Sequence, residues 1–159
     1  MPGVNAIVLG AGGQLGSALV RLLGRGSGVT HAEVSITDPD SIDYLVHRRR
    51  PEIVFNCAAY NAVDRAETER DLAFAVNGEG PANVARACVR SGARLIHFST
   101  NFVFDGALDR PFVETDQPAP LSVYGSSKLE GERQGLDLHE LGAGAYPDFV
   151  SHNDDFLQR

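Results

Sequence analysis

A tyrosine and a lysine lie four residues apart, at Tyr124 and Lys128. On a helix, residues at this spacing share a face, with roughly 5–6 Å between their Cβ atoms. A free phenol has a pKa of about 10, but a neighbouring ammonium stabilises the phenolate and lowers that pKa. A tyrosine tuned in this way can donate a proton to an alkoxide as it forms during carbonyl reduction. The alternative is an ordinary exposed tyrosine and lysine; Lys128 is the single lysine of the chain.

A glycine-rich segment, residues 10–16, follows a short apolar run and precedes a helical apolar stripe. In this setting the first glycine permits a tight turn, the second lets a phosphate approach the backbone, and the third lets the helix pack on the strand. Amides at the helix start then face a pyrophosphate. The segment predicts a dinucleotide site, against the alternative of a purely structural turn. No clean acidic ribose ligand follows, and Glu33 is the nearest candidate.

Two hydroxyl residues, Ser99 and Thr100, end a predicted strand. Ligands of open parallel sheets bind outside the carboxyl ends of the strands, so a hydroxyl here could hydrogen-bond a substrate carbonyl oxygen as negative charge develops. The alternative is a hydroxyl that only caps the backbone. His97, two residues before Thr100, is expected to be a packed core residue rather than a catalyst.

The elements that must position these residues alternate between strand and helix. Buried strands are predicted over residues 5–9, 53–57 and 95–98, with a short one within 29–34. Helical patterns cover residues 15–23, 39–50, 72–91 and 124–134. Strands alternating with helices predict right-handed βαβ units and a parallel sheet with helices on both faces. After Glu132 the pattern fades, glycines 135, 142 and 144 interrupt it, and no further βαβ unit is expected.

The predicted fold class is therefore α/β, a Rossmann-like doubly wound parallel sheet that is incomplete at its C-terminal side. Residues 1–134 are expected to form a partial dinucleotide-binding domain, and residues 135–159 a divergent tail. The length of 159 residues suits one domain.

Composition excludes several classes of protein. The net charge of −7 argues against nucleic-acid binding, which needs a basic face. No apolar run approaches the ~20 residues that span a bilayer, and the first residues lack a basic signal-like region. The expectation is a cytoplasmic protein without a membrane partner. Cys57 and Cys88 lie in apolar contexts, which favours buried thiols over a disulfide or a metal site, so no metal is expected.

Taken together, the chain resembles the extended short-chain dehydrogenase/reductases, and within them the dTDP-4-dehydrorhamnose reductase family, over about residues 4–133. The stretches that carry the resemblance are residues 10–16, 56–67, 75–77, 99–106 and 120–132. The glycine segment and the Tyr–Lys pair are shared across the superfamily. Residues 56–67 and 102–106 favour this reductase over sugar epimerases and dehydratases.

The resemblance implies a role for each matched residue. Tyr124 would be the acid, Lys128 its partner and a ligand of the cofactor ribose, and Thr100 the hydroxyl that binds the substrate carbonyl. The cofactor would be NADPH or NADH, and the substrate a dTDP-linked 4-keto-6-deoxy sugar of dTDP-L-rhamnose synthesis. The residues implied in cofactor binding cradle the pyrophosphate or line the nicotinamide side; they are Gly10, Gly13, Gln14, Leu15, Gly16, Ala58, Ala59 and Tyr60.

The chain departs from the family pattern in four places. The second strand is short, Ser35 replaces a usual aspartate, Asn101 and Phe102 replace a usual Asp-Tyr, and the match ends near Arg133 in a family of longer chains. These departures lead us to expect a reductase truncated to its N-terminal half, weak or inactive alone. Three alternatives stay open: a non-catalytic nucleotide-binding or partner-binding module, another sugar-nucleotide epimerase or dehydratase, and a reductase completed by a homodimer partner or a second chain.

Overall fold

Five parallel strands form one sheet in the computed structural model, which describes residues 4–113, 115–140 and 148–152. The strand order is β2-β1-β3-β4-β5, and every neighbouring pair is parallel. The strands are β1 (Ala6–Leu9), β2 (Gly28–Val29), β3 (Ile53–Asn56), β4 (Arg94–Thr100) and β5 (Asp148–His152). The predicted parallel α/β sheet is confirmed.

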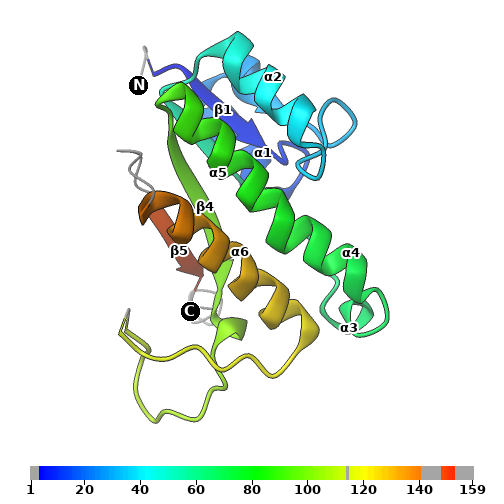
Figure 1. The fold of residues 1–159 in the computed structure, drawn as a ribbon, viewed down its shortest axis with the longest axis vertical. Helices are drawn as coiled ribbons and strands as arrows, with labels where there is room; N and C mark the ends of the chain where they lie inside the picture. Colours follow the sequence, from blue (N-terminus) through cyan, green and yellow to red (C-terminus); the bar gives the residue numbers. More distant parts are fainter. Residues whose placement is uncertain (1–3, 114, 141–147, 153–159) are drawn as a thin grey trace.

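The helices lie on both faces of the sheet (Figure 1). Helix α1 packs on β1 and β2, whereas α5 packs between α2 and α6 on the other face. This division follows from the strand order. Strand β2 is added on one side of β1, and β3, β4 and β5 are added on the other side. Because the crossovers are right-handed, this reversal moves the connecting helices to the opposite face of the sheet. The helical segments are α1 (Gln14–Leu23), η1 (Arg25–Ser27), α2 (Pro39–Arg49), α3 (Val63–Ala66), α4 (Arg70–Phe74), η2 (Ala75–Glu79), α5 (Gly80–Ser91), η3 (Asn101–Val103) and α6 (Val123–Glu140).

The core lies between the sheet and the row of α2 and α5. Val54 of β3 and Leu95 of β4 are buried against α5, in one cluster with Val84 and Cys88. Successive side chains of a strand point to opposite faces, so their neighbours Ile53, Phe55 and Ile96 point to the face of α1, where they are only half-buried. The two faces of β3 and β4 are therefore unequally covered by the described elements.

One π-helical turn, η2, joins α4 to α5 in a helix that runs from residue 70 to 91. Pro81 has no N–H to donate to the carbonyl of Asn77, so this carbonyl lacks the i+4 partner that it would have in a regular α-helix. Helix α6 approaches this point closely, since a Cβ added at Gly131 would lie 2.2 Å from the Asn77 carbonyl oxygen. A π turn of this kind is often found at functional sites.

Two expectations about the strands need correction: the position of the short second strand, expected within residues 29–34, and the absence of a further βαβ unit after Glu132. Strand β2 has only the two residues Gly28 and Val29, and the chain then turns, with the Glu33 carboxylate accepting hydrogen bonds from the amide (2.7 Å) and hydroxyl (2.8 Å) of Thr30. The expectation of no further βαβ unit after Glu132 is wrong: α6 continues to Glu140, and β5 pairs with β4 from Ile96–Asp148 to Thr100–His152.

The physical reason lies in helix packing. Gly135 is inside α6, because the loss of about 1 kcal/mol in helix propensity does not end a helix that is held by packing. Glycines 142 and 144 lie outside the described residues, as does most of the predicted tail.

No helix in the described part of the chain is long and apolar enough to cross a membrane. Both cysteines are free thiols, Cys88 buried and Cys57 half-buried.

Candidate active site

The glycine segment makes a tight turn between β1 and α1. Gly10 has a φ of 74°. Two backbone hydrogen bonds fix the turn around it: Ala11 N donates to Val29 O (3.1 Å), and Gly13 N donates to Gly10 O (3.0 Å). A Cβ at Gly10 would lie 2.7 Å from Ala58 N, and one at Gly16 would lie 2.2 Å from Gly10 O. No side chain caps the first turn of α1, so its amides remain available to an anion.

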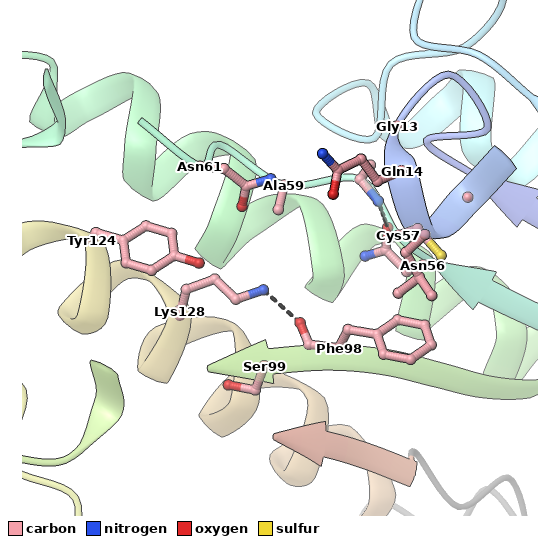
Figure 2. A pocket seen from close by; sticks show the side chains of 13 residues that line it. Gly13, Gln14, Asn56, Cys57, Ala59, Asn61, Phe98, Ser99, Tyr124 and Lys128 are labelled. Carbon is pink, nitrogen blue, oxygen red and sulfur yellow. Dashed lines mark hydrogen bonds between the residues drawn. The ribbon is translucent and has the colours of Figure 1, made fainter. Parts of the chain in front are cut away.

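A pocket of about 700 Å³ opens beside this turn (Figure 2). This volume lies in the range of small-ligand sites. The glycine turn, the end of β3, the end of β4 and α6 each contribute to it. The lining residues are Gly13, Gln14, Leu15, Gly16, Asn56, Cys57, Ala58, Ala59, Asn61, Phe98, Ser99, Tyr124 and Lys128. The structure therefore brings together most of the residues singled out in the sequence, from four separate segments.

Tyr124 and Lys128 extend into this pocket from successive turns of α6 (Figure 2). Lys128 is 2% exposed, and its Nζ donates a hydrogen bond of 2.6 Å to the Phe98 carbonyl. Burial lowers the pKa of the Lys128 ammonium to about 8, and the charge of Glu132 opposes this shift. The Tyr124 ring packs edge-on against Phe102, with 5.6 Å between centroids. An acid and a cation thus face the same space.

The segment after β3 lines the opposite side with Ala58, Ala59 and Asn61. Its start is fixed by the buried Asn56, whose Oδ1 accepts a bond from Ala58 N at 3.2 Å. The Tyr60 side chain is turned elsewhere, since its hydroxyl donates to Glu69 at 2.5 Å. The backbone of Tyr60, rather than its ring, is the part held next to the pocket.

A buried asparagine, Asn77, holds this segment against α6. Its Oδ1 accepts from Tyr60 N at 2.8 Å, and its Nδ2 donates to Tyr60 O and to Ser127 Oγ, both at 3.0 Å. The Ser127 hydroxyl in turn donates to Tyr124 O at 2.7 Å. Asn77 lies in the π turn, and the sequence pattern assigned it no role, because nothing in the residue types marks such a turn.

A carboxylate fixes the start of α6. Val123 N, at the first position of the helix, donates to Glu67 Oε1 at 2.8 Å. A negative charge at a helix N-terminus is favoured by the helix dipole. Glu67 belongs to one of the stretches that carried the resemblance, and here it sets the position of Tyr124, the next residue.

The two strand-end hydroxyls have different surroundings. Thr100 is 7% exposed; its Oγ1 accepts from Phe102 N at 3.3 Å, and thereby caps η3, and it lies 3.4 Å from Asn101 Oδ1. Ser99 lines the pocket, and its hydroxyl donates to the carboxylate of Glu132. The predicted carbonyl-binding residue Thr100 is thus beside the pocket, with its hydroxyl engaged in a turn.

His97 and Cys57 are poor candidates for acid-base or nucleophilic work. His97 is 1% exposed, and burial, together with the charge of Lys128, lowers its pKa to about 3. Its Nδ1 lies 3.2 Å from the side-chain amide of Asn56. Burial raises the pKa of the Cys57 thiol to about 11. The expectation that His97 is a core residue is confirmed, and Cys57 lines the pocket as a protonated thiol.

The pocket residues that the sequence did not single out are Asn56, Cys57, Asn61 and Phe98. Asn56 and Cys57 end one predicted strand, and Phe98 ends another. Asn61 follows the first strand by four residues, within the stretch 56–67 that carries the resemblance. Position at or just after the carboxyl end of a parallel strand was the signal that could have found them. In the described residues no group of three or more His, Cys, Asp or Glu side chains could hold a metal ion.

The comparisons with known proteins agree with the family resemblance seen in the sequence. The family model of the RmlD substrate binding domain matches residues 4–140. A dTDP-4-dehydrorhamnose reductase of Mycobacterium tuberculosis is 47% identical over 138 residues, which cover 82% of this chain and 45% of that protein. The chain spans about half the length of the curated relatives it matches.

Solved structures agree. The dTDP-4-dehydrorhamnose reductase from Bacillus anthracis in complex with NADP has a TM-score of 0.80 and 39% identity, over 84% of this chain and 49% of that one. The reductase from Clostridium acetobutylicum has a TM-score of 0.81 and 33% identity, over 92% and 51%. The resemblance seen in the sequence is confirmed, and the chain belongs to the RmlD substrate binding domain family.

Proposed function

We propose that this chain binds NADPH or NADH in the pocket beside the glycine turn and contributes the acid for reduction of a dTDP-linked 4-keto-6-deoxy sugar. The observation that carries the proposal is the convergence of the glycine turn with Tyr124 and Lys128 on one pocket. The names and structures of the relatives support the same reaction class.

The pocket fits a nicotinamide dinucleotide. Gly10 and Gly16 leave no room for a Cβ, so the turn keeps its backbone exposed at the uncapped start of α1, where a pyrophosphate would accept hydrogen bonds. Ala58 and Ala59 would border the nicotinamide, and Lys128 would hold its ribose. When bound, this cofactor supplies a hydride to C4 of the sugar.

The residues of this chain supply the proton. As the C4 carbonyl becomes an alkoxide, Tyr124 donates its phenolic proton to that oxygen and becomes a phenolate. The Lys128 ammonium stabilises the phenolate until solvent returns the proton. Phe98 O holds the Lys128 Nζ at the floor of the pocket, which fixes its distance from Tyr124. Thr100 would donate its O–H to the carbonyl oxygen instead of to Asn101 Oδ1, which lies 3.4 Å away, while its Oγ1 continues to accept from Phe102 N.

A second candidate is a nucleotide-binding module without turnover. One observation favours it: the chain spans about half the length of its relatives. In this case the cofactor would bind, but no sugar nucleotide would be reduced. Both candidates therefore predict that the cofactor binds, and they differ in whether NADPH is oxidised when the keto sugar nucleotide is present.

The test measures cofactor binding and turnover separately. We expect calorimetric titration to show weak, saturable binding of NADPH or NADH, weak because β2 is short. We expect Tyr124→Phe to keep this binding and to lose about 10²–10⁴-fold of any NADPH oxidation that depends on the keto sugar nucleotide. Lys128→Ala should lose both. Tyr44→Phe, on an exposed ring of α2, is the matched control.

Three outcomes decide between the candidates. No saturation at millimolar cofactor by a folded sample contradicts both. Binding without turnover selects the nucleotide-binding module. Turnover at equal rates in the wild type and Tyr124→Phe removes the proposed acid.

A further inference from the structure

A third polar side chain lies on the face of α6 that carries Tyr124 and Lys128. Glu132 follows Lys128 by four residues, so the two side chains are neighbours on successive turns. Its carboxylate accepts a hydrogen bond from the hydroxyl of Ser99, a pocket residue at the end of β4. Glu132 is partly buried, and it belongs to neither the Tyr–Lys pair nor the lining of the pocket.

Two successive turns of α6 are thereby fastened to the same end of β4. Lys128 Nζ donates to the carbonyl of Phe98, and the next residue of the strand, Ser99, donates to Glu132. The two bonds hold the ammonium and the carboxylate in a fixed arrangement, because each is tied to an adjacent residue of one buried strand. Glu132 therefore acts on Lys128 from a set position rather than as a freely moving surface charge.

The other charged or titratable groups around Lys128 cannot replace this carboxylate. Tyr124, one turn before it, has a phenol, which carries a negative charge only after it has given up its proton. His97, beneath it on β4, has a pKa of about 3 and carries no charge at neutral pH. Arg133, beside Glu132, is a cation and acts on the carboxylate itself. Glu132 is thus the group that offsets the cost of burying the ammonium.

We propose that Glu132 is a positioning residue that keeps Lys128 protonated at the floor of the pocket, through a carboxylate held by Ser99. The proposal deepens the proposed function, since a neutral Lys128 would neither stabilise the Tyr124 phenolate nor hold a ribose as well. Its first test, however, needs no cofactor and no turnover.

The direct test is the titration of Lys128. Because Lys128 is the single lysine of the chain, a protein grown with isotopically labelled lysine gives one side-chain amine signal by NMR. Glu132→Gln keeps the size of the side chain and an oxygen that can accept from Ser99, but removes the charge. We expect its titration midpoint for Lys128 to fall by about one pH unit relative to the wild type.

Two further variants make the result specific. Glu130→Gln removes the same charge from the same helix, two residues from Lys128 and on another face, where the partner is Gln134 at 2.7 Å; its midpoint should move by less than half as much. Glu132→Asp restores the charge, and its midpoint should return toward the wild-type value. If Glu132→Gln does not fold, Ser99→Ala is the test variant, because it removes the hydroxyl that holds the carboxylate, and the Lys128 midpoint should then shift from the wild-type value.

A second readout follows the pH profile of NADPH affinity. Glu132→Gln should lose more affinity between neutral and mildly alkaline pH than the wild type or Glu130→Gln does. An unchanged midpoint in Glu132→Gln, an equal fall in Glu130→Gln, or no recovery in Glu132→Asp overturns the proposal. If no variant and no wild-type sample binds NADPH, the proposed function fails while the Lys128 titration still decides the role of Glu132.

Discussion

At the scale of single residues, burial decides which of the titratable side chains can take part in chemistry. Lys128 and His97 are both nearly inaccessible, and burial lowers the pKa of each. For Lys128 this leaves a cation that needs a carboxylate nearby, whereas for His97 it leaves a neutral ring. The sequence shows the residue types but not the depth of burial, which depends on how α6 packs over β4.

The buried His97 predicts a loss of stability in mild acid. Its pKa is 6.5 in the unfolded chain and about 3 in the folded protein. Below pH 6.5 the unfolded chain therefore binds a proton that the folded protein does not, and the free energy of unfolding should fall as the pH is lowered, by up to about 1.4 kcal/mol per pH unit. Urea denaturation at pH 7.0, 6.0 and 5.0 measures this slope.

The variant that isolates the effect is His97→Asn, whose Oδ1 can stand in for Nδ1 beside Asn56. It should be less stable overall but show a flatter slope than the wild type, whereas His47→Asn, at an exposed position, should keep the slope. Glu132, whose pKa is raised by burial, acts in the opposite direction above pH 4.5 and can only reduce the slope. Parallel slopes in all three proteins would contradict a buried neutral His97.

At the scale of elements, two close approaches set the position of α6. A Cβ at Gly125 would lie 2.2 Å from Phe102 O, and one at Gly131 would lie 2.2 Å from Asn77 O. The first contact places the start of the helix over the turn after β4, and the second places its middle over the π turn. Tyr124 directly precedes Gly125, and Lys128 lies between Gly125 and Gly131, so these glycines fix the acid and the cation relative to the rest of the pocket.

Gly131→Ala should therefore destabilise the protein. A glycine-to-alanine change within a helix ordinarily stabilises it by up to about 1 kcal/mol, but here the added methyl must push α6 away from Asn77, which should cost about 1–3 kcal/mol in the free energy of unfolding. Gly26→Ala is the control, because a Cβ there meets nothing within 4 Å. Chemical denaturation of the three proteins measures the effect; a gain of stability in Gly131→Ala would show that the two helices do not meet closely.

Much of this arrangement could be predicted from the sequence, because the strong signals are local. The apolar runs of β1, β3 and β4, the glycine turn and the Asp38-Pro39 start of α2 are each visible in a few residues, and the Asp38 side chain does accept bonds from the amides of Asp40 and Ser41. The π turn and β5 could not be predicted: the turn depends on the fit between α5 and α6, and β5 on pairing with a strand some fifty residues earlier in the chain.

The residues of the site likewise fall into two groups: those that local spacing in the sequence predicts, and those whose partners lie far away in the chain. The glycine turn and the Tyr–Lys pair follow from spacing, and the structure brings both to one pocket. The links made by Asn77, Glu67 and Glu132 join segments 17 to 56 residues apart. Residue type alone does not reveal such partners. The orientation of Tyr60 likewise depends on Glu69 and Asn77, which is why its ring could not be placed from the sequence.

At the scale of the whole molecule, one face of the sheet is only partly covered. Helix α1 packs on β1 and β2, whereas α5 and α6 pack on β4. The half-buried side chains there include Ile53, Phe55 and Ile96, of which Phe55 and Ile96 are paired across β3 and β4. We call these three residues the open face. Contiguous apolar patches of this kind favour association with another protein surface.

The open face predicts that this chain self-associates in solution. Burying apolar side chains of two copies against each other removes them from water, at roughly 25 cal/mol per Å². We expect the sedimentation coefficient to rise with protein concentration. Ile96→Thr, which keeps a β-branched side chain but adds a hydroxyl, should weaken association, whereas Leu121→Thr, at a site that is 82% exposed and away from the sheet, should not.

The same open face should limit thermal stability, since its side chains gain less from folding than fully buried ones do. We expect a modest melting temperature that rises with protein concentration, because association stabilises the folded state by mass action. Ile96→Thr should remove the concentration dependence, while Leu121→Thr should retain it. A single monomeric species at every concentration, with a cooperative melt above about 65 °C, would mean that this face is covered within the chain itself.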